Sequence, residues 1–101
     1  MIKMKSTLGP AAPGGYVQAT GIPVVFGEFQ RINRAEAFCD QGQVLGAVDT
    51  IYSLSVVITG VTVAIHVWTE ATVGGPGNAL TELAGATALD ARTFTVIADG
   101  E

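Results

Sequence analysis

The side chains best suited to catalysis are a single histidine and a single cysteine, His66 and Cys39. A cysteine and a histidine can act as nucleophile and base wherever a fold brings them together. The residues around the cysteine, AFCDQG, lack the basic neighbours that activate a thiol, and the carboxylate of Asp40 disfavours a thiolate. We therefore expect no catalytic pair, with Cys39 buried and His66 facing solvent or a neighbouring molecule.

Other kinds of chemical site are equally hard to build from this sequence. One histidine and one cysteine do not supply the ligands of a zinc site, and the aspartates are too scattered for a calcium loop. The GGPG run at 74–77 lacks the lysine and the following helix of a phosphate-binding loop. A chain of 101 residues would also scarcely wall a cleft around paired carboxylates. The sequence predicts a non-enzymatic protein with no catalytic residue, metal ion or cofactor.

One group of residues could bind sugar. His66, Trp68 and Glu70 alternate along the chain, so they share one face if this segment is a strand. An aromatic ring with polar neighbours on a flat face can serve as a platform for a carbohydrate. A carbohydrate- or cell-surface-binding module centred on Trp68 is therefore the alternative functional reading.

The element that carries these residues is predicted with the most detail. Apolar residues occupy the even positions of 53–59 and the odd positions of 61–67, so the phase changes at Gly60. Strand side chains alternate between faces, and one extra residue exchanges core for surface. Gly60 therefore marks a hairpin turn or a bulge, of which the hairpin is the better fit. We expect these two strands to form the central part of the sheet.

The remaining segments point to short strands joined by turns. Segments 16–20 and 23–26 are predicted as short strands, with Pro23 at an edge or a strand start, and 93–98 as a final strand. Apolar residues recur every three positions in 28–39, which fits a short helix, although a strand or loop remains open. Residues 79–91 fit either one helical turn or an irregular strand.

The fold expected from these elements is all-β: an antiparallel β-sandwich or small barrel, with one short helix near 28–39 as an option. Its two parts are an extended N-terminal arm over 1–15 and a single β domain over 16–101. Pro10, Pro13 and three glycines in the arm oppose a helix. We expect this arm to be disordered or to become ordered only against a partner.

Charge is scarce and unevenly distributed. Charged residues make up 14% of the chain and the net charge is -4, which argues against a nucleic-acid partner. No run approaches the length of a membrane span. Residues 1–34 hold four basic residues against Glu28, whereas 35–101 hold Arg92 against eight carboxylates. The arm residues Lys3, Lys5, Pro10 and Pro13 could therefore dock on the acidic body of a neighbouring copy.

The uncharged middle of the chain predicts a covered surface. Residues 41–69 contain one formal charge, Asp49. Outer strand positions normally carry lysine and glutamate, but here they carry small or uncharged groups that can face protein without burying a charge. We expect self-association into a homo-oligomer, or docking on a partner, through four outward positions of the second strand: Thr62, Ala64, His66 and Trp68.

The segment SVVITGVTVAIHVWTEATVGGPGNALTELAG combines two alternating strands, a glycine turn and a glycine-rich tip. It resembles small β-sandwich virion proteins of tailed bacteriophages, of the capsid decoration (cement) or tail accessory type, although the aromatic residue that often follows the tip is absent. The resemblance implies a virion structural protein that is assembled in the host cytoplasm. It also implies many copies on the major capsid protein or another virion protein, stabilising the shell as a multimer. No site residues carry over from such families.

Overall fold

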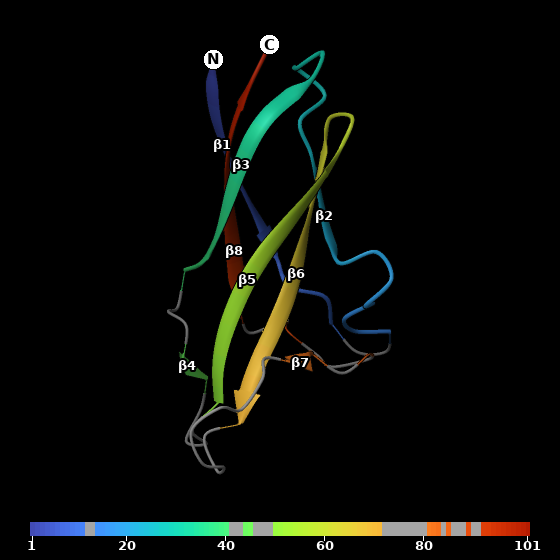
Figure 1. Ribbon diagram of the computed structural model, residues 1–101, viewed down its shortest axis with the longest axis vertical. Helices are drawn as coiled ribbons and strands as arrows, with labels where there is room; N and C mark the ends of the chain where they lie inside the picture. The colour runs from blue at the N-terminus through green and yellow to red at the C-terminus, as the bar shows by residue number, and fades with distance from the viewer. Residues whose placement is uncertain are drawn as a thin grey trace.

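The computed structural model describes residues 1–11, 14–40, 44–45, 50–71, 81–83, 85, 89 and 92–101. Within these residues the chain forms strands and no helix (Figure 1). The strands are β1 (Ile2–Leu8), β2 (Ile22–Val25), β3 (Ile32–Cys39), β4 (Val44–Leu45), β5 (Thr50–Thr59), β6 (Thr62–Ala71), β7 (Thr81–Glu82) and β8 (Thr93–Gly100).

Two antiparallel sheets pack face to face. Sheet A has the strand order β1-β8-β3, and sheet B has the order β2-β6-β5-β4, with β7 also paired to β6. Because β4 and β7 contribute two residues each, three longer strands form the body of each sheet. The predicted all-β sandwich is thus confirmed. Both marked chain ends lie at the same end of the sandwich, where β1 and β8 pair (Figure 1).

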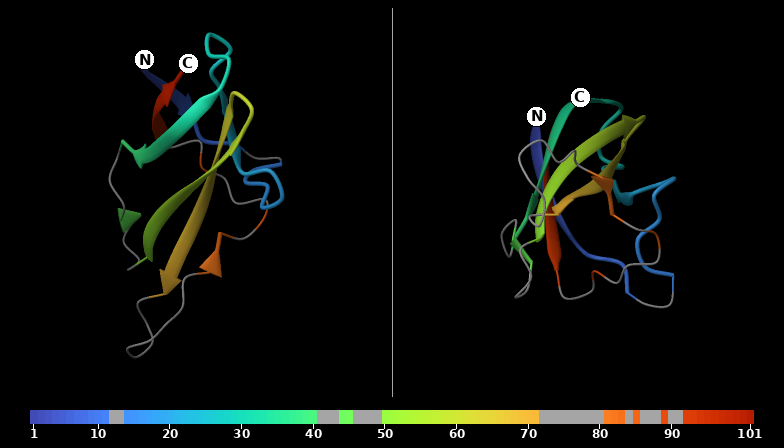
Figure 2. Two further views of the ribbon diagram at one scale, coloured as in Figure 1. Left: turned by 45° about the horizontal axis from the view of Figure 1, so that its top comes forward. Right: turned by 60° about the horizontal axis from the view of Figure 1, so that its bottom comes forward.

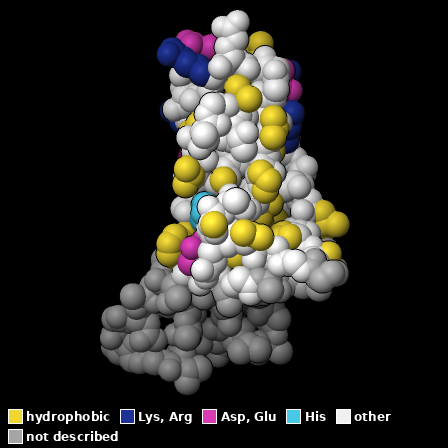
Figure 3. Space-filling model, turned by 90° about the vertical axis from the view of Figure 1, so that its right-hand side faces the viewer, with side chains coloured by type: hydrophobic (Ala, Val, Ile, Leu, Met, Phe, Trp, Pro, Cys, Tyr) yellow, Lys and Arg dark blue, Asp and Glu magenta, His cyan; other side chains and the backbone are white. Residues whose placement is uncertain are grey.

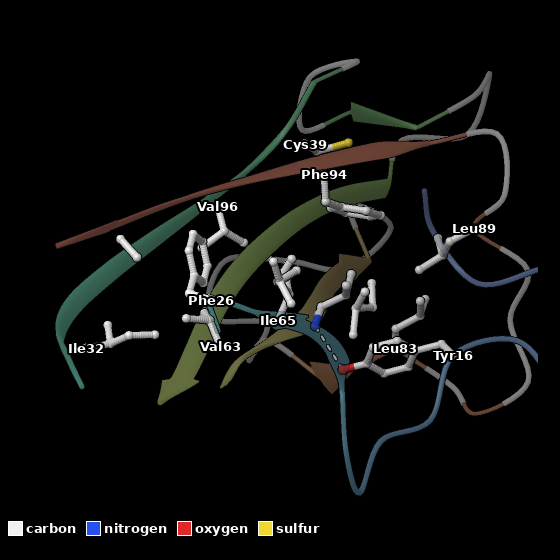
Figure 4. Close-up of a cluster of buried hydrophobic side chains, with 14 of the residues drawn as sticks. Tyr16, Phe26, Ile32, Cys39, Val63, Ile65, Leu83, Leu89, Phe94 and Val96 are labelled. Carbon is white, nitrogen blue, oxygen red and sulfur yellow. Dashed lines mark hydrogen bonds between the residues drawn. The ribbon is translucent and has the colours of Figure 1, made fainter. Parts of the chain in front are cut away.

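Alternation along the central strands builds the core. Val63, Ile65 and Val67 of β6 are fully buried, and Phe94 and Val96 of β8 face them from the other sheet (Figure 4). Full burial of side chains of this size contributes about 1.5–3 kcal/mol each. The outward positions of the same strands are therefore fixed by the inward ones, because strand side chains alternate between faces.

The predicted hairpin at Gly60 is confirmed. Thr59 pairs with Thr62, so Gly60 and Val61 form a two-residue loop between the ten-residue strands β5 and β6. Gly60 has a φ of 61°, in the left-handed region where glycine carries no steric penalty. The predicted strands at 23–26 and 93–98 correspond to β2 and β8, and β2 lies at an edge as Pro23 suggested.

The option of a short helix near 28–39 is wrong, because Ile32–Cys39 forms β3. The pairing of β3 with β8 shifts register between Ile32 and Arg34, which marks an irregularity in the strand. This shift puts Ile32 on the core side although it lies an even number of residues from outward Arg34. The shift therefore explains why Ile32 and Ala35, three residues apart, share the core side, whereas Phe38 faces outward.

The strand predicted at 16–20 is also absent. Residues 18–20 form a turn, closed by a hydrogen bond from the Gly21 amide to the Val17 carbonyl at 2.7 Å. Gly21 has a φ of 66°, and a Cβ at this position would lie 2.6 Å from the Ile65 carbonyl oxygen. The turn therefore requires glycine both for its backbone conformation and for its close approach to β6.

The expected N-terminal arm does not stand apart from the β domain. Ile2–Leu8 forms β1 and pairs along its whole length with β8 of the same chain. Further along, the Pro10 carbonyl accepts a hydrogen bond from the Leu89 amide at 2.7 Å. Pro13 and the glycine-rich segment 73–78 lie outside the described residues, and of 79–91 the structure describes a strand only at β7.

The two lateral sides of the sandwich are closed differently. At one side β3 packs alongside β5, with Ala35 and Ala37 of β3 partly buried against the core (Figure 2). At the other side the Lys5 ammonium of β1 reaches sheet B, where it donates to the Val25 carbonyl at 2.9 Å. We call these the β3–β5 side and the β1–β2 side.

Candidate functional site

The residues predicted to face a partner lie together on the outer surface of sheet B. Val63, Ile65 and Val67 point into the core, so the alternate positions of β6 point outward. These are Thr62, Ala64, His66 and Trp68, and all four are half-buried. Pairing with β2 and β5 extends this surface. We call it the sheet B face, formed by Pro23, Val25, Ser53, Ser55, Val57, Thr59, Thr62, Ala64, His66 and Trp68.

The sheet B face carries no Lys, Arg, Asp or Glu at these ten positions. Val25 and Val57, on either side of β6, are 55% and 51% exposed. Seen from the side on which β2 lies, uncharged groups cover the middle of the molecule (Figure 3). Basic and acidic side chains gather toward the top and along one edge, and the histidine lies next to an acidic group.

Trp68 has its indole nitrogen occupied. Its Nε1 donates to the hydroxyl of Ser55 on β5 at 2.8 Å, so the ring is tied to the neighbouring strand. The side chain of Glu70, the third member of the predicted sugar platform, lies outside the described residues. Within the described residues the platform therefore consists of one half-buried indole and an imidazole that is bonded elsewhere.

A cluster of three polar side chains lies at the border of the sheet B face. The Glu82 carboxylate of β7 accepts a hydrogen bond from the Tyr16 hydroxyl at 2.6 Å. The same oxygen, Oε2, lies 2.8 Å from Nδ1 of His66 on β6, so Nδ1 carries the proton when the two bond. Tyr16 and His66 themselves lie 3.5 Å apart. One carboxylate thus joins three segments of the chain.

Tyr16 also repairs a gap in the hydrogen-bond ladder at the edge of β6. The strand β2 pairs with Thr62 to Ile65, and β7 pairs with Trp68 and Thr69. Between them the Val67 amide donates to the Tyr16 hydroxyl at 3.0 Å, drawn as the dashed line in Figure 4. An unpaired buried amide costs free energy, and the Tyr16 hydroxyl avoids that cost by accepting the hydrogen bond that a neighbouring strand would otherwise accept.

The cluster is suited to holding structure rather than to acid–base chemistry. Burial raises the pKa of Tyr16 to about 12, and its hydrogen bond to the Glu82 carboxylate acts in the same direction. Hydrogen bonds from His66, and then from Tyr16, lower the pKa of Glu82. A carboxylate held ionised between two donors is a poor proton donor near neutral pH. Sequence reasoning missed Tyr16 and Glu82.

Cys39 and His66 cannot act as a pair in this fold. Cys39 lies opposite Phe94 in the register of sheet A and is buried in the core, as expected. His66 points away from the core on the outer side of sheet B. In the described part of the chain no group of three or more His, Cys, Asp or Glu side chains could hold a metal ion, and no helix is long and apolar enough to cross a membrane.

The two lysines predicted to dock on a neighbour have different surroundings. Lys5 lies 3.2 Å from a Glu28 carboxylate oxygen and its ammonium lies 5.2 Å from the centre of the Phe26 ring. Its charge is therefore used within the chain. Lys3 is exposed on the same strand. The two lysines of this strand thus differ in their contacts within the chain, and their predicted docking on a neighbour stays a prediction.

A further exposed apolar area lies on the outer surface of sheet A, which the sequence analysis did not single out. Ile2 and Met4 of β1 are each 67% exposed, and Met4 lies level with Ile97 of β8. Leu8 and Phe38 extend the area at 62% and 43% exposed. We call it the β1 patch, formed by Ile2, Met4, Leu8, Phe38 and Ile97.

Charged side chains border the β1 patch. Arg34 of β3 lies 3.6 Å from a carboxylate oxygen of Asp99 on β8, and Glu36 lies level with Ile97. Together with Ile2 and Ile97 these three side chains line a shallow hollow of about 280 Å³. An apolar area rimmed by charges is the usual signature of a protein-binding surface.

Comparisons with known proteins add no identification: no family model, curated protein or solved structure matches this chain.

Proposed function

We propose that this chain is a non-enzymatic structural component of a virion, of the decoration type, that docks on the shell of the particle in many copies. The observation that carries the proposal is the β1 patch. Its three β1 side chains, Ile2, Met4 and Leu8, are each more than 60% exposed, and they lie on the face of sheet A that is turned away from sheet B. Exposed apolar areas bordered by polar residues mark sites of protein interaction.

The polar groups of the structure support a structural role. The described side chains that could catalyse a reaction are used to hold strands together, since Tyr16, His66 and Glu82 bond to one another at the edge of β6. The uncharged sheet B face offers a second surface that protein can cover without burying a charge. The virion context itself comes from the resemblance of residues 55–85 to phage decoration proteins.

Binding to shells that lack the chain tests this proposal. We expect purified protein to co-sediment with shells assembled from the major capsid protein of its virion. Met4→Lys places a charge in the β1 patch and should weaken binding at least tenfold, because the charge must be desolvated in the interface. Val17→Lys is the matched control, at an exposed position outside both the β1 patch and the sheet B face.

Two results would count against a shell-docking role. One is the absence of the chain from purified particles, measured by quantitative mass spectrometry. The other is a Met4→Lys variant that folds normally and binds shells as well as the Val17→Lys variant does. Specific glycan binding that is lost in Trp68→Ala, with shell binding unchanged in Met4→Lys, would favour the carbohydrate-binding alternative.

A further inference from the structure

Exposed strand edges invite pairing with another chain, and native sheets usually protect them with charge, proline or an irregularity. Three edge strands of this sandwich carry such protection. The strand β1 has Lys3 and Lys5, and the short β2 has Pro23. The strand β3 has a register shift between Ile32 and Arg34, followed by charged side chains.

The strand β5 carries none of these features. Among the described strands, its pairing with β4 ends at Ile51, and beyond that point it pairs with β6 alone. The edge from Ser53 to Thr59 reads SLSVVIT, without charge or proline. The strand β3 shares a hollow with Leu54, Ser55 and Val56, and from Ser55 toward the hairpin every residue except the half-buried Val56 is exposed. Val57 and Ile58 there are 51% and 36% exposed.

We propose that residues Ser55–Thr59 of β5 pair with the same residues of a second copy, in antiparallel register about a two-fold axis at Val57. This deepens the proposed function, on which it rests, by naming the contact between copies. The axis puts Val57 opposite its own equivalent, Val56 opposite Ile58, and Ser55 opposite Thr59. Every pair joins side chains from the same face of the sheet, because the positions in each pair differ by an even number.

The chemistry of this register favours a second copy over an unrelated strand. It pairs hydroxyl with hydroxyl and β-branched apolar side chains with one another, which are stabilising cross-strand combinations. No like charges meet, because the segment has none. The same operation on β1 would place Lys5 opposite itself in the register that pairs the whole strand, and Lys3 opposite Lys5 in one of the shorter registers that match its faces. Among these edges, β5 is therefore the one suited to self-pairing.

Such pairing would join the sheets of two copies. The strands β2, β6 and β5 of each copy would form one continuous six-stranded sheet, and the two sheet B faces would merge into a larger uncharged surface. A contact built on five residues per copy is small, so the isolated dimer is expected to be weak and to depend on concentration. Docking of many copies on one shell would raise their effective concentration and reinforce it.

Cysteine cross-linking tests the register directly. In an antiparallel pair, directly opposite residues have Cα atoms about 4.5–5.5 Å apart, within the range of a disulfide. Val57→Cys should therefore form a disulfide-linked dimer under mild oxidation. Val25→Cys, with similar exposure on the other edge of sheet B, measures the background from random collisions. The native Cys39 is buried and present in every sample.

Sedimentation velocity of the full chain over about 10 µM to 1 mM provides the second measurement. We expect a monomer–dimer equilibrium that Val57→Lys shifts at least tenfold toward monomer, because two lysines would then face each other. Val25→Lys should leave the equilibrium unchanged.

A chain that stays monomeric throughout this range, or Val57→Cys cross-linking no faster than Val25→Cys, would overturn the inference. Equal effects of the two lysine variants would also overturn it. The shell-binding experiment with Met4→Lys is independent of these results, so failure of the dimer and failure of the proposed function can be told apart.

Discussion

The two lateral sides of the sandwich close the space between the sheets with different kinds of side chain. At the β3–β5 side the strands approach closely, and the partly buried Ala35 and Ala37 line one hollow with Leu54 and Val56. At the β1–β2 side the closure depends on side chains, with Lys5 lying over Phe26. Small apolar residues suffice where backbones come together, whereas longer and partly polar side chains are needed where they do not.

The difference extends along the β1–β2 side. Beyond Ile22, the first residue of β2, Tyr16 and Glu82 continue the closure through hydrogen bonds to β6. These contacts come from residues far apart in the sequence, and they require specific donors and acceptors. The β3–β5 side should therefore tolerate conservative apolar substitutions. At the β1–β2 side, removing a single hydrogen-bonding atom should lower the stability of the fold.

Removing one large side chain from each side should give the greatest contrast. Phe26 is fully buried and stacks on Phe29 with ring centroids 5.8 Å apart, so Phe26→Ala should lower the free energy of unfolding by about 3–5 kcal/mol. Leu54 is only partly buried, and Leu54→Ala should cost about 1–2 kcal/mol. Urea denaturation of both variants measures the difference, and equal losses would contradict the distinction between the sides.

Removing a single oxygen from the β1–β2 side should have a smaller but clear effect. Tyr16→Phe leaves the Val67 amide without its partner and should cost about 1–3 kcal/mol. For a domain of this size, each kcal/mol lowers the melting temperature by about 4–8 °C. Ser6→Ala removes an exposed hydroxyl and is the control, expected to change stability by less than about 0.5 kcal/mol. A Tyr16→Phe melting curve that overlays that of Ser6→Ala would refute the role of the hydroxyl.

Acid should weaken the β1–β2 side in a way that depends on Glu82. The pKa of Glu82 is lowered from 4.5 in the folded state. Its ionised carboxylate therefore stabilises the fold fully at pH values well above 4.5. The effect is lost as the pH falls below 4.5 through the lowered pKa. Glu82→Gln should therefore melt below the wild-type protein at pH 7, and the gap should narrow in acid. A gap that stays constant down to pH 3 would show that the carboxylate charge is unimportant.

The sequence allowed most of sheet B to be predicted because its alternation is unambiguous. In 53–67 the apolar phase and the single break at Gly60 admit few arrangements, and the structure has the predicted hairpin. The outward phase of β6 followed from the same pattern. Local alternation is enough where a strand has paired neighbours along most of its length and one face in the core.

The strand β1 shows where such a pattern misleads. Its sequence IKMKSTL alternates regularly, but the lysines face the core side and Ile2 and Met4 face outward. This inversion is possible at an edge, where the stem of Lys5 can run across the side of the sandwich and deliver its charge to the surface. Composition alone suggested a basic arm, because the partner strand lies some ninety residues away.

Tyr16 and Glu82 could not have been identified from sequence for a related reason. Their role depends on a gap along β6, between Ile65, which pairs with β2, and Trp68, which pairs with β7. The pairing of distant segments sets that gap. The residues next to Tyr16 in the sequence give no indication of that gap. The β1 patch escaped notice because its members come from three strands that are adjacent only in the folded sheet.

The strand order of sheet A has a consequence for how the chain folds during synthesis. Its middle strand, β8, follows β1 and β3 in the chain, and among the described strands neither of these has another sheet partner. The hairpin of β5 and β6 can form early from local contacts, but half of the sandwich must wait while translation continues. Until β8 leaves the ribosome, Ile2, Met4 and the apolar side of β3 stay exposed together, and this interval is when chaperones would be most needed.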